Sequence, residues 1–93
     1  MYAVAFDLDV KATSANHPKG ISAAYSDIRS LLERRGFVWR QGSLYTLDDS
    51  DMAKLFAAIL ALKALPWFPT SVRDIRAFKV EQWSDFTALV KGE

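Results

Sequence analysis

Residues 1–9 read MYAVAFDLD, a pattern that predicts a central β-strand ending in acidic residues. Successive side chains of a strand point to opposite faces of the sheet. The even positions are bulky and apolar, and they should enter a core: Tyr2, Val4, Phe6 and Leu8. The odd positions are small and then acidic: Ala3, Ala5, Asp7 and Asp9.

Asp7 is the leading candidate for a functional residue. It stands at the carboxyl end of the predicted strand, where flanking apolar residues would hold its carboxylate rigidly beside a cleft. The small residues on the same face allow a second subunit, a metal ion or a phosphate to approach the backbone closely. The alternative is that Asp7 and Asp9 only terminate the strand and stay solvated.

Length and composition indicate one small domain, residues 1–93, without thiol chemistry. A chain of this size buries roughly 60–65% of the surface that its unfolded form exposes, so a second subunit would help its stability. The absence of cysteine excludes disulfides, thiolate zinc sites and a Cys nucleophile, and a single histidine excludes a His-rich metal site. Any catalysis must rest on carboxylates, hydroxyls, Arg and Lys.

Charge and hydropathy limit the kinds of partner that the chain can bind. The formal net charge is +1, so nucleic-acid binding would need a local basic patch. Hydrophobic residues make up 51% of the chain and aromatic residues 13%, which indicates an interface as well as a core. No apolar run approaches the ~20 residues of a membrane span, and no basic region precedes the first apolar stretch. We therefore expect a cytoplasmic protein.

The rest of the chain predicts two main helices and three more strands. We expect a loop at 10–20, a helix capped by Ser22 or Gly20 and closed by Gly36, and strands at 37–40 and 43–47 joined by a turn at Gln41–Gly42. The acidic residues 48–51 should cap a helix at 52–65, followed by a strand at 72–80 and a short C-terminal helix capped by Ser84 or Asp85.

Two features have two interpretations each. His17 lies in the predicted loop, where it is either a solvated side chain or a catalytic group delivered beside Asp7. Trp67 and Phe68 lie between two prolines, where they either pack inside or form a surface for stacking bases. Packing is the favoured interpretation of this pair.

The order β-α-β-β-α-β predicts an α+β, ferredoxin-like fold with an antiparallel four-stranded sheet, two helices on one face and a short C-terminal helix. The first and third strands should be central, so Asp7, Ser43 and Asp74 should meet at one edge of the sheet. Nearby guanidinium groups would bind phosphate oxygens: Arg40, Arg73 and Arg76. The alternative is that Asp74 simply pairs with a neighbouring Arg.

Three segments resemble the virulence-associated protein D family: residues 1–8, residues 36–45 and, above all, SVRDIRAFKVE at 71–81. The resemblance covers essentially the whole chain. It implies a bacterial, homodimeric endoribonuclease, often regarded as the toxin of a toxin–antitoxin pair, with a fold similar to the small CRISPR-associated nuclease-like subunit. It places the family's functional residues on Asp7, Ser43 and Asp74.

RNA cleavage is therefore the leading functional hypothesis, with RNA, a second copy of the chain and an antitoxin protein as partners. Asp7 would act as a general base or bind a divalent metal, for which Mg²⁺ suits carboxylate ligands. Ser43 would hydrogen-bond a phosphate or orient the attacking hydroxyl, and Asp74 would be the second carboxylate.

Two other functions remain open at this point. Residues 6–10, FDLDV, resemble the nucleophile segment of haloacid dehalogenase phosphatases, but that chemistry needs a parallel sheet and further motifs. The second alternative is a non-catalytic dimer that binds RNA or a partner protein, with its acids serving only structure or contact.

Overall fold

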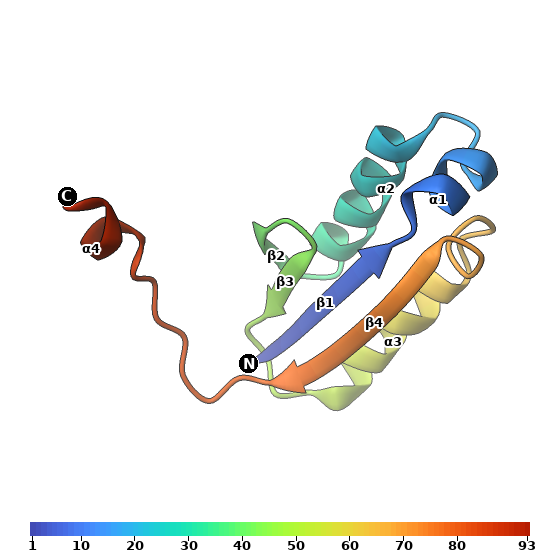
Figure 1. Ribbon diagram of the computed structural model, residues 1–93. Helices are drawn as coiled ribbons and strands as arrows, with labels where there is room; N and C mark the ends of the chain where they lie inside the picture. Colours follow the sequence, from blue (N-terminus) through green and yellow to red (C-terminus); the bar gives the residue numbers. More distant parts are fainter.

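The computed structural model describes all 93 residues and contains one antiparallel sheet with the strand order β2-β3-β1-β4 (Figure 1). The strands are β1 (Tyr2–Leu8), β2 (Val38–Gln41), β3 (Leu44–Leu47) and β4 (Val72–Lys79). The helices are α1 (Val10–Asn16), α2 (Ile21–Arg34), α3 (Met52–Lys63) and α4 (Thr87–Lys91). The expected ferredoxin-like arrangement, with the first and third strands central, is confirmed. Every helix of the structure is too short or too polar to span a bilayer.

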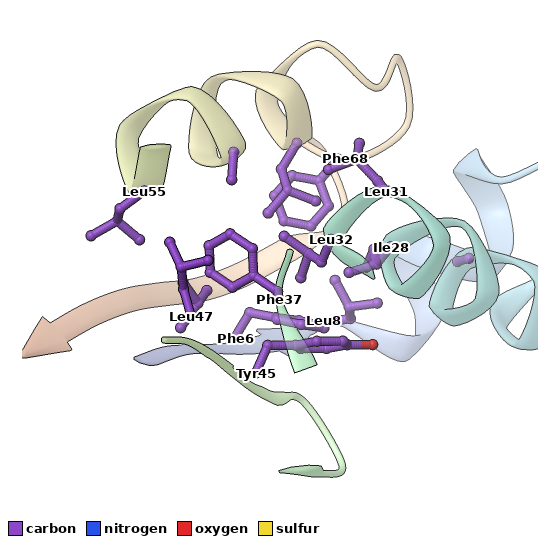
Figure 2. Close-up of a cluster of buried hydrophobic side chains, with 14 of the residues drawn as sticks. Phe6, Leu8, Ile28, Leu31, Leu32, Phe37, Tyr45, Leu47, Leu55 and Phe68 are labelled. Atoms are coloured by element: carbon purple, nitrogen blue, oxygen red, sulfur yellow. The ribbon is translucent and has the colours of Figure 1, made fainter. Parts of the chain in front are cut away.

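The bulky face of β1 is the floor of the core. Val4, Phe6 and Leu8 are buried there against side chains of α2 and α3 (Figure 2). The helices contribute apolar residues at helical spacing: Ala24, Ile28, Leu31 and Leu32 from α2, and Leu55, Ala58 and Leu62 from α3. Burial of each large side chain contributes roughly 1.5–3 kcal/mol. The period-2 and helical patterns therefore fix which way β1 faces.

The loop expected at 10–20 is wrong, because α1 occupies residues 10–16. Asp9 caps this helix: its Oδ1 accepts a hydrogen bond of 2.8 Å from the backbone N–H of Ala12. Thr13 is fully buried, and its hydroxyl donates to the backbone oxygen of Asp9 at 2.7 Å. Asp9 thus ends the strand by starting a helix, which its acidic side chain alone did not reveal.

His17 is not solvated but is 6% exposed. Its Nδ1 accepts from the backbone N–H of Lys19 at 3.0 Å, so the ring proton lies on Nε2, which donates to Asp27 Oδ2 at 2.7 Å. The ring also meets Trp67 edge-on, with centroids 5.0 Å apart. His17 therefore ties the end of α1 to α2, and no contact joins it to Asp7.

Three smaller expectations can be compared with the structure. Trp67 and Phe68 are buried, so the packing interpretation is correct and the base-stacking surface is wrong. The hairpin turn falls at Gly42–Ser43, one residue later than expected. Helix capping by Asp51 is confirmed, since its Oδ1 accepts from the backbone N–H of Ala53 at 2.9 Å.

The chain beyond β4 leaves the body of the domain (Figure 1). It ends in α4, where no residue is buried, and the backbone N–H of Thr87 donates to Asp85 Oδ1 at 2.9 Å. Phe86, Leu89 and Val90 are largely exposed. These apolar side chains of the C-terminal arm, residues 81–93, therefore remain uncovered within one chain.

Candidate active site

The pairing of β1 with β4 places Asp7 directly opposite Asp74. Both belong to the face of the sheet that turns away from the core, with side chains 59% and 50% exposed. Directly opposed residues of antiparallel strands have Cβ atoms about 4.5–5.5 Å apart, and like charges there repel each other. Two solvent-facing carboxylates at this spacing need cations beside them.

A β-bulge supplies the first cation. The β1–β4 register shifts after Asp7, so that Leu8 pairs with Val72 and Arg73 is the extra residue. Without the bulge, Arg73 would lie opposite the buried Leu8 and share its face. Instead, Arg73 Nη1 lies 3.5 Å from Asp7 Oδ2 and its Nη2 lies 3.1 Å from Asp9 Oδ2. The bulge therefore turns Arg73 from the core toward the carboxylates.

Asp9 is the residue whose role at the site was missed from the sequence. The backbone N–H of Ala12 and then the Arg73 guanidinium hold the pKa of Asp9 below its usual range. The hydrogen bond to Asp9 and the charge of Asp7 in turn raise the pKa of Arg73. Asp9 is thus a fixed anion that both caps α1 and holds Arg73 beside Asp7.

Arg76 supplies the second cation. Its Nε donates to both carboxylate oxygens of Asp74, at 3.2 and 3.1 Å. The side chain is 78% exposed, and its two terminal nitrogens have no partner within the chain. Asp74 is therefore paired with a neighbouring Arg, as the structural alternative expected, while the remaining donors of Arg76 are free for a phosphate.

Ser43 lies at the same end of the sheet but is not beside the two carboxylates. Its backbone oxygen accepts from the N–H of Phe6 at 3.2 Å, which aligns it with Phe6 and not with Asp7. Its side chain lines a cavity on the helix-covered face together with Tyr25 and Tyr45. The predicted trio thus lies at one end of the sheet without converging: Asp7 and Asp74 are paired on one face, and Ser43 is in the hairpin turn, aligned with Phe6.

Arg40 is placed away from these residues. It is the bulged residue of β2, and its Nε donates to Thr46 Oγ1 at 2.8 Å. Thr46 pairs with Ala3, four positions before Asp7 on β1. The guanidinium also lies over the ring of Trp83, 5.5 Å from its centroid. Any contact of Arg40 with RNA would be separate from the Asp7–Asp74 pair.

The acids at this end of the sheet are paired with cations of the protein itself. No three Asp, Glu, His or Cys side chains converge anywhere in the chain. The guanidinium of Arg73 bridges Asp7 and Asp9, and that of Arg76 binds Asp74, so each carboxylate already has a cation of the protein. This end of the sheet, which we call the carboxylate edge, therefore consists of the carboxylates of Asp7, Asp9 and Asp74 and the guanidinium groups of Arg73 and Arg76.

Comparison with known proteins identifies relatives over the full length of the chain, although no family model matches it. The endoribonuclease VapD homolog of Neisseria gonorrhoeae is 67% identical over 92 residues, covering 99% of this chain and 100% of that protein. Endoribonuclease VapD of Haemophilus influenzae is 57% identical, again over 99% of this chain and 100% of that protein. Endoribonuclease VapD of Dichelobacter nodosus is 49% identical over 99% of both chains. With relatives this similar from end to end, this chain belongs to the VapD family, the virulence-associated protein D family that its sequence resembles.

Proposed function

We propose that this protein is an endoribonuclease that cleaves RNA phosphodiester bonds at the Asp7–Asp74 edge. The observation that carries the proposal is the opposed carboxylate pair, with a guanidinium group beside each member. Carboxylates accept protons, and guanidinium groups bind phosphate oxygens through several donors at once. The names of the relatives, endoribonuclease VapD, support the same reaction.

In this proposal Asp7 is the general base. It takes the proton of the attacking hydroxyl, for which the 2′-hydroxyl of RNA is the nearest nucleophile to the scissile phosphate. The hydroxyl oxygen forms a bond to phosphorus, the bond to the 5′-oxygen breaks, and that oxygen takes a proton from solvent. The products are a 2′,3′-cyclic phosphate and a free 5′-hydroxyl.

The remaining residues position the phosphate. Arg73 and Arg76 stabilise the negative charge that develops on its oxygens, because both guanidinium groups are already held in place by carboxylates. Asp74 is the second carboxylate and orients Arg76. Ser43 donates its hydroxyl to the substrate from the hairpin turn. Arg40 contributes a more distant contact to the RNA backbone.

We further propose that the enzyme acts as a homodimer. Ala5 is half-buried on the outer face of β1, where its small side chain leaves room for a second sheet, whereas Ala3 on the same face is already fully buried within the chain. The C-terminal arm carries uncovered apolar side chains, including Phe86, Leu89 and Val90. Exposed apolar surface of this kind marks an interaction site. In a two-fold symmetric dimer, each chain would cover the exposed apolar side chains of the other chain's C-terminal arm.

The family resemblance supports a biological role as a bacterial toxin that acts in the cytoplasm and is bound by an antitoxin protein. Expression in a bacterial host should then arrest growth, and Asp7→Asn should relieve the arrest at equal protein levels. Equal arrest by the parent and by the variant would separate growth inhibition from RNA cleavage.

Incubation of the purified protein with RNA, with and without EDTA, tests the proposed activity. Cleavage should persist in EDTA and leave 2′,3′-cyclic phosphate ends. A 2′-deoxy substitution at the scissile nucleotide should block it. Binding of RNA without any cleavage would favour the non-catalytic dimer, and cleavage abolished by EDTA would overturn the metal-free mechanism.

A further inference from the structure

A cavity of about 440 Å³ lies between α2 and the β2–β3 hairpin. Its lining includes Tyr25, Ser26, Arg29, Trp39, Ser43 and Tyr45. The volume falls in the range of sites that bind small molecules or parts of larger ones. None of these side chains is a partner of Asp7, Asp9 or Asp74. We call this cavity the aromatic cleft.

The aromatic walls of the cleft are held rigidly. The ring of Phe6, which is buried, stacks on Tyr25 with centroids 6.3 Å apart and on Tyr45 with centroids 6.2 Å apart. Figure 2 shows Phe6 and Tyr45 close together on the sheet, with the Tyr45 hydroxyl pointing away from the packed side chains. Trp39 is 42% exposed, and its Nε1 donates to the backbone oxygen of Gly42 at 3.0 Å. Flat, fixed and partly exposed rings suit the stacking of a nucleobase.

Arg29 adds hydrogen-bond donors to these walls. Its guanidinium carbon lies 4.4 Å from the centroid of the Trp39 ring, and its Nε donates to Glu33 Oε1 at 2.7 Å. The two terminal nitrogens have no partner within the chain, so they are free to bind acceptor atoms of a ligand. Burial raises the pKa of the Tyr45 hydroxyl, and a tyrosine is a donor at neutral pH even without such a shift.

The cleft and the carboxylate edge are adjacent in the fold. Ser43 lines the cleft, and its backbone oxygen is bonded to the N–H of Phe6, the residue before Asp7. An RNA strand that crosses the end of the sheet at the Gly42–Ser43 turn therefore passes from the aromatic cleft to the carboxylate edge. The faces of a base are available for stacking only when the base leaves its helix.

We infer that the aromatic cleft binds one unpaired nucleobase of the RNA, so that the substrate must be single-stranded beside the phosphate that reaches Asp7. This inference rests on the proposed function, because it deepens it from RNA to a single-stranded segment. Tyr25 and Trp39 supply the stacking surfaces. Arg29 binds acceptors on the edge of the base or on the adjacent phosphate.

The test uses full-length Asp7→Asn protein, so that bound RNA stays intact. A single-stranded oligonucleotide carries the fluorescent base 2-aminopurine at one position at a time, and the same strand is also annealed to its complement. Stacking in the cleft should quench 2-aminopurine at one position of the single strand, whereas the duplex, in which 2-aminopurine is already stacked and dim, should show no further change. Trp39→Leu should weaken binding by about 5- to 150-fold, the usual effect of losing one stacking partner.

Arg29→Gln, on the exposed face of α2, is the second variant and should also weaken binding. Arg34→Gln removes the same charge from the same helix outside the cleft, and it should change the affinity by less than about 3-fold. Quenching that does not depend on position, equal binding of duplex and single strand, or unchanged affinity of folded Arg29→Gln protein would each overturn the inference. If the unmodified protein cleaves RNA but any of these three contrary results is obtained, the proposed function stands and the inference about the cleft fails. If the cleft binds a base and the parent does not cleave, the proposed function fails and the inference stands.

Discussion

Replacing Asp7 by Asn removes one charge from the carboxylate edge with almost no change in side-chain volume. The side chain is 59% exposed, and its one ionic contact is Arg73 Nη1 at 3.5 Å. Arg73 keeps its closer partner, Asp9 Oδ2 at 3.1 Å, and the repulsion between Asp7 and Asp74 is lost. Exposed ion pairs contribute little to stability, so the melting temperature should stay within about 4 °C of the parent.

The expected loss is in the chemical step and not in binding. The edge holds three carboxylates and two guanidinium groups, a net charge of −1, which Asp7→Asn brings to zero. A phosphate should approach a neutral edge at least as readily as a negative one, so KM should not rise. Loss of a general base commonly lowers kcat by ~10²–10⁴, which corresponds to about 2.7–5.4 kcal/mol of transition-state stabilisation.

Single-turnover cleavage of an end-labelled single-stranded RNA, with enzyme in excess, measures the chemical step directly. Thermal melting of the same preparations reports the fold. Asp9→Asn serves as the control, because it removes a charge from the same end of the sheet without touching the proposed base, and it should slow cleavage less. The reasoning is refuted if Asp7→Asn cuts RNA at the parental rate with a parental melting curve. A higher KM with an unchanged kcat would make Asp7 a binding residue only.

Four further predictions concern stability, RNA binding and assembly. Asp9→Ala should melt below Asp9→Asn by circular dichroism, because Asn can still cap α1 while both variants lose the ion pair with Arg73. The pKa of Asp9 is lowered in the folded protein, so its ionised carboxylate stabilises the fold above the unfolded-state pKa of about 3.9, and this stabilisation is lost as the pH falls through the folded-state pKa. The difference in melting temperature between the unmodified protein and Asp9→Asn should therefore shrink below about pH 4. A difference that stays constant with pH would contradict this. Arg76→Ala should weaken RNA retention and reduce its salt dependence with the dimer intact, which filter binding across salt concentrations would measure. Deletion of residues 81–93 should give a monomer by sedimentation at micromolar concentration, and a full-length protein that is already monomeric would remove the dimer proposal.

The sheet could be predicted because its determinants are local and repetitive. The alternation in residues 1–9 sets the buried face of β1, and the helical spacing of apolar residues in α2 and α3 covers that face. By contrast, α1 is seven residues long and buries only Thr13. A helix this short shows no apolar periodicity that could be detected in the sequence. It is held by its cap at Asp9 and by the buried contacts of His17.

The sequence predicted which strands carry the site residues, but it did not predict on which face of the sheet each side chain lies. Topology alone brings Asp7 and Asp74 to one end of the sheet, since β1 and β4 are antiparallel neighbours. The bulge at Arg73 depends on the packing of Leu8 and Val72, which no local pattern encodes. Likewise, a turn that falls one residue later places Ser43 in the hairpin loop, aligned with Phe6, and not at the start of β3. A one-residue difference in register exchanges the two faces of a strand.

The position of Asp9 also decides between the two families that its sequence context resembles. In residues 6–10, FDLDV, two acids at this spacing resemble the acid pair of a phosphatase nucleophile segment. Here the second acid accepts from the N–H of Ala12 and binds Arg73, so its carboxylate serves the start of α1 and the orientation of a guanidinium group. The sheet that carries it is antiparallel, whereas the phosphatase chemistry needs a parallel one. The spacing of the two acids is therefore explained by one strand end and one helix cap: Asp9 serves the cap, and Asp7 contacts only Arg73, at 3.5 Å.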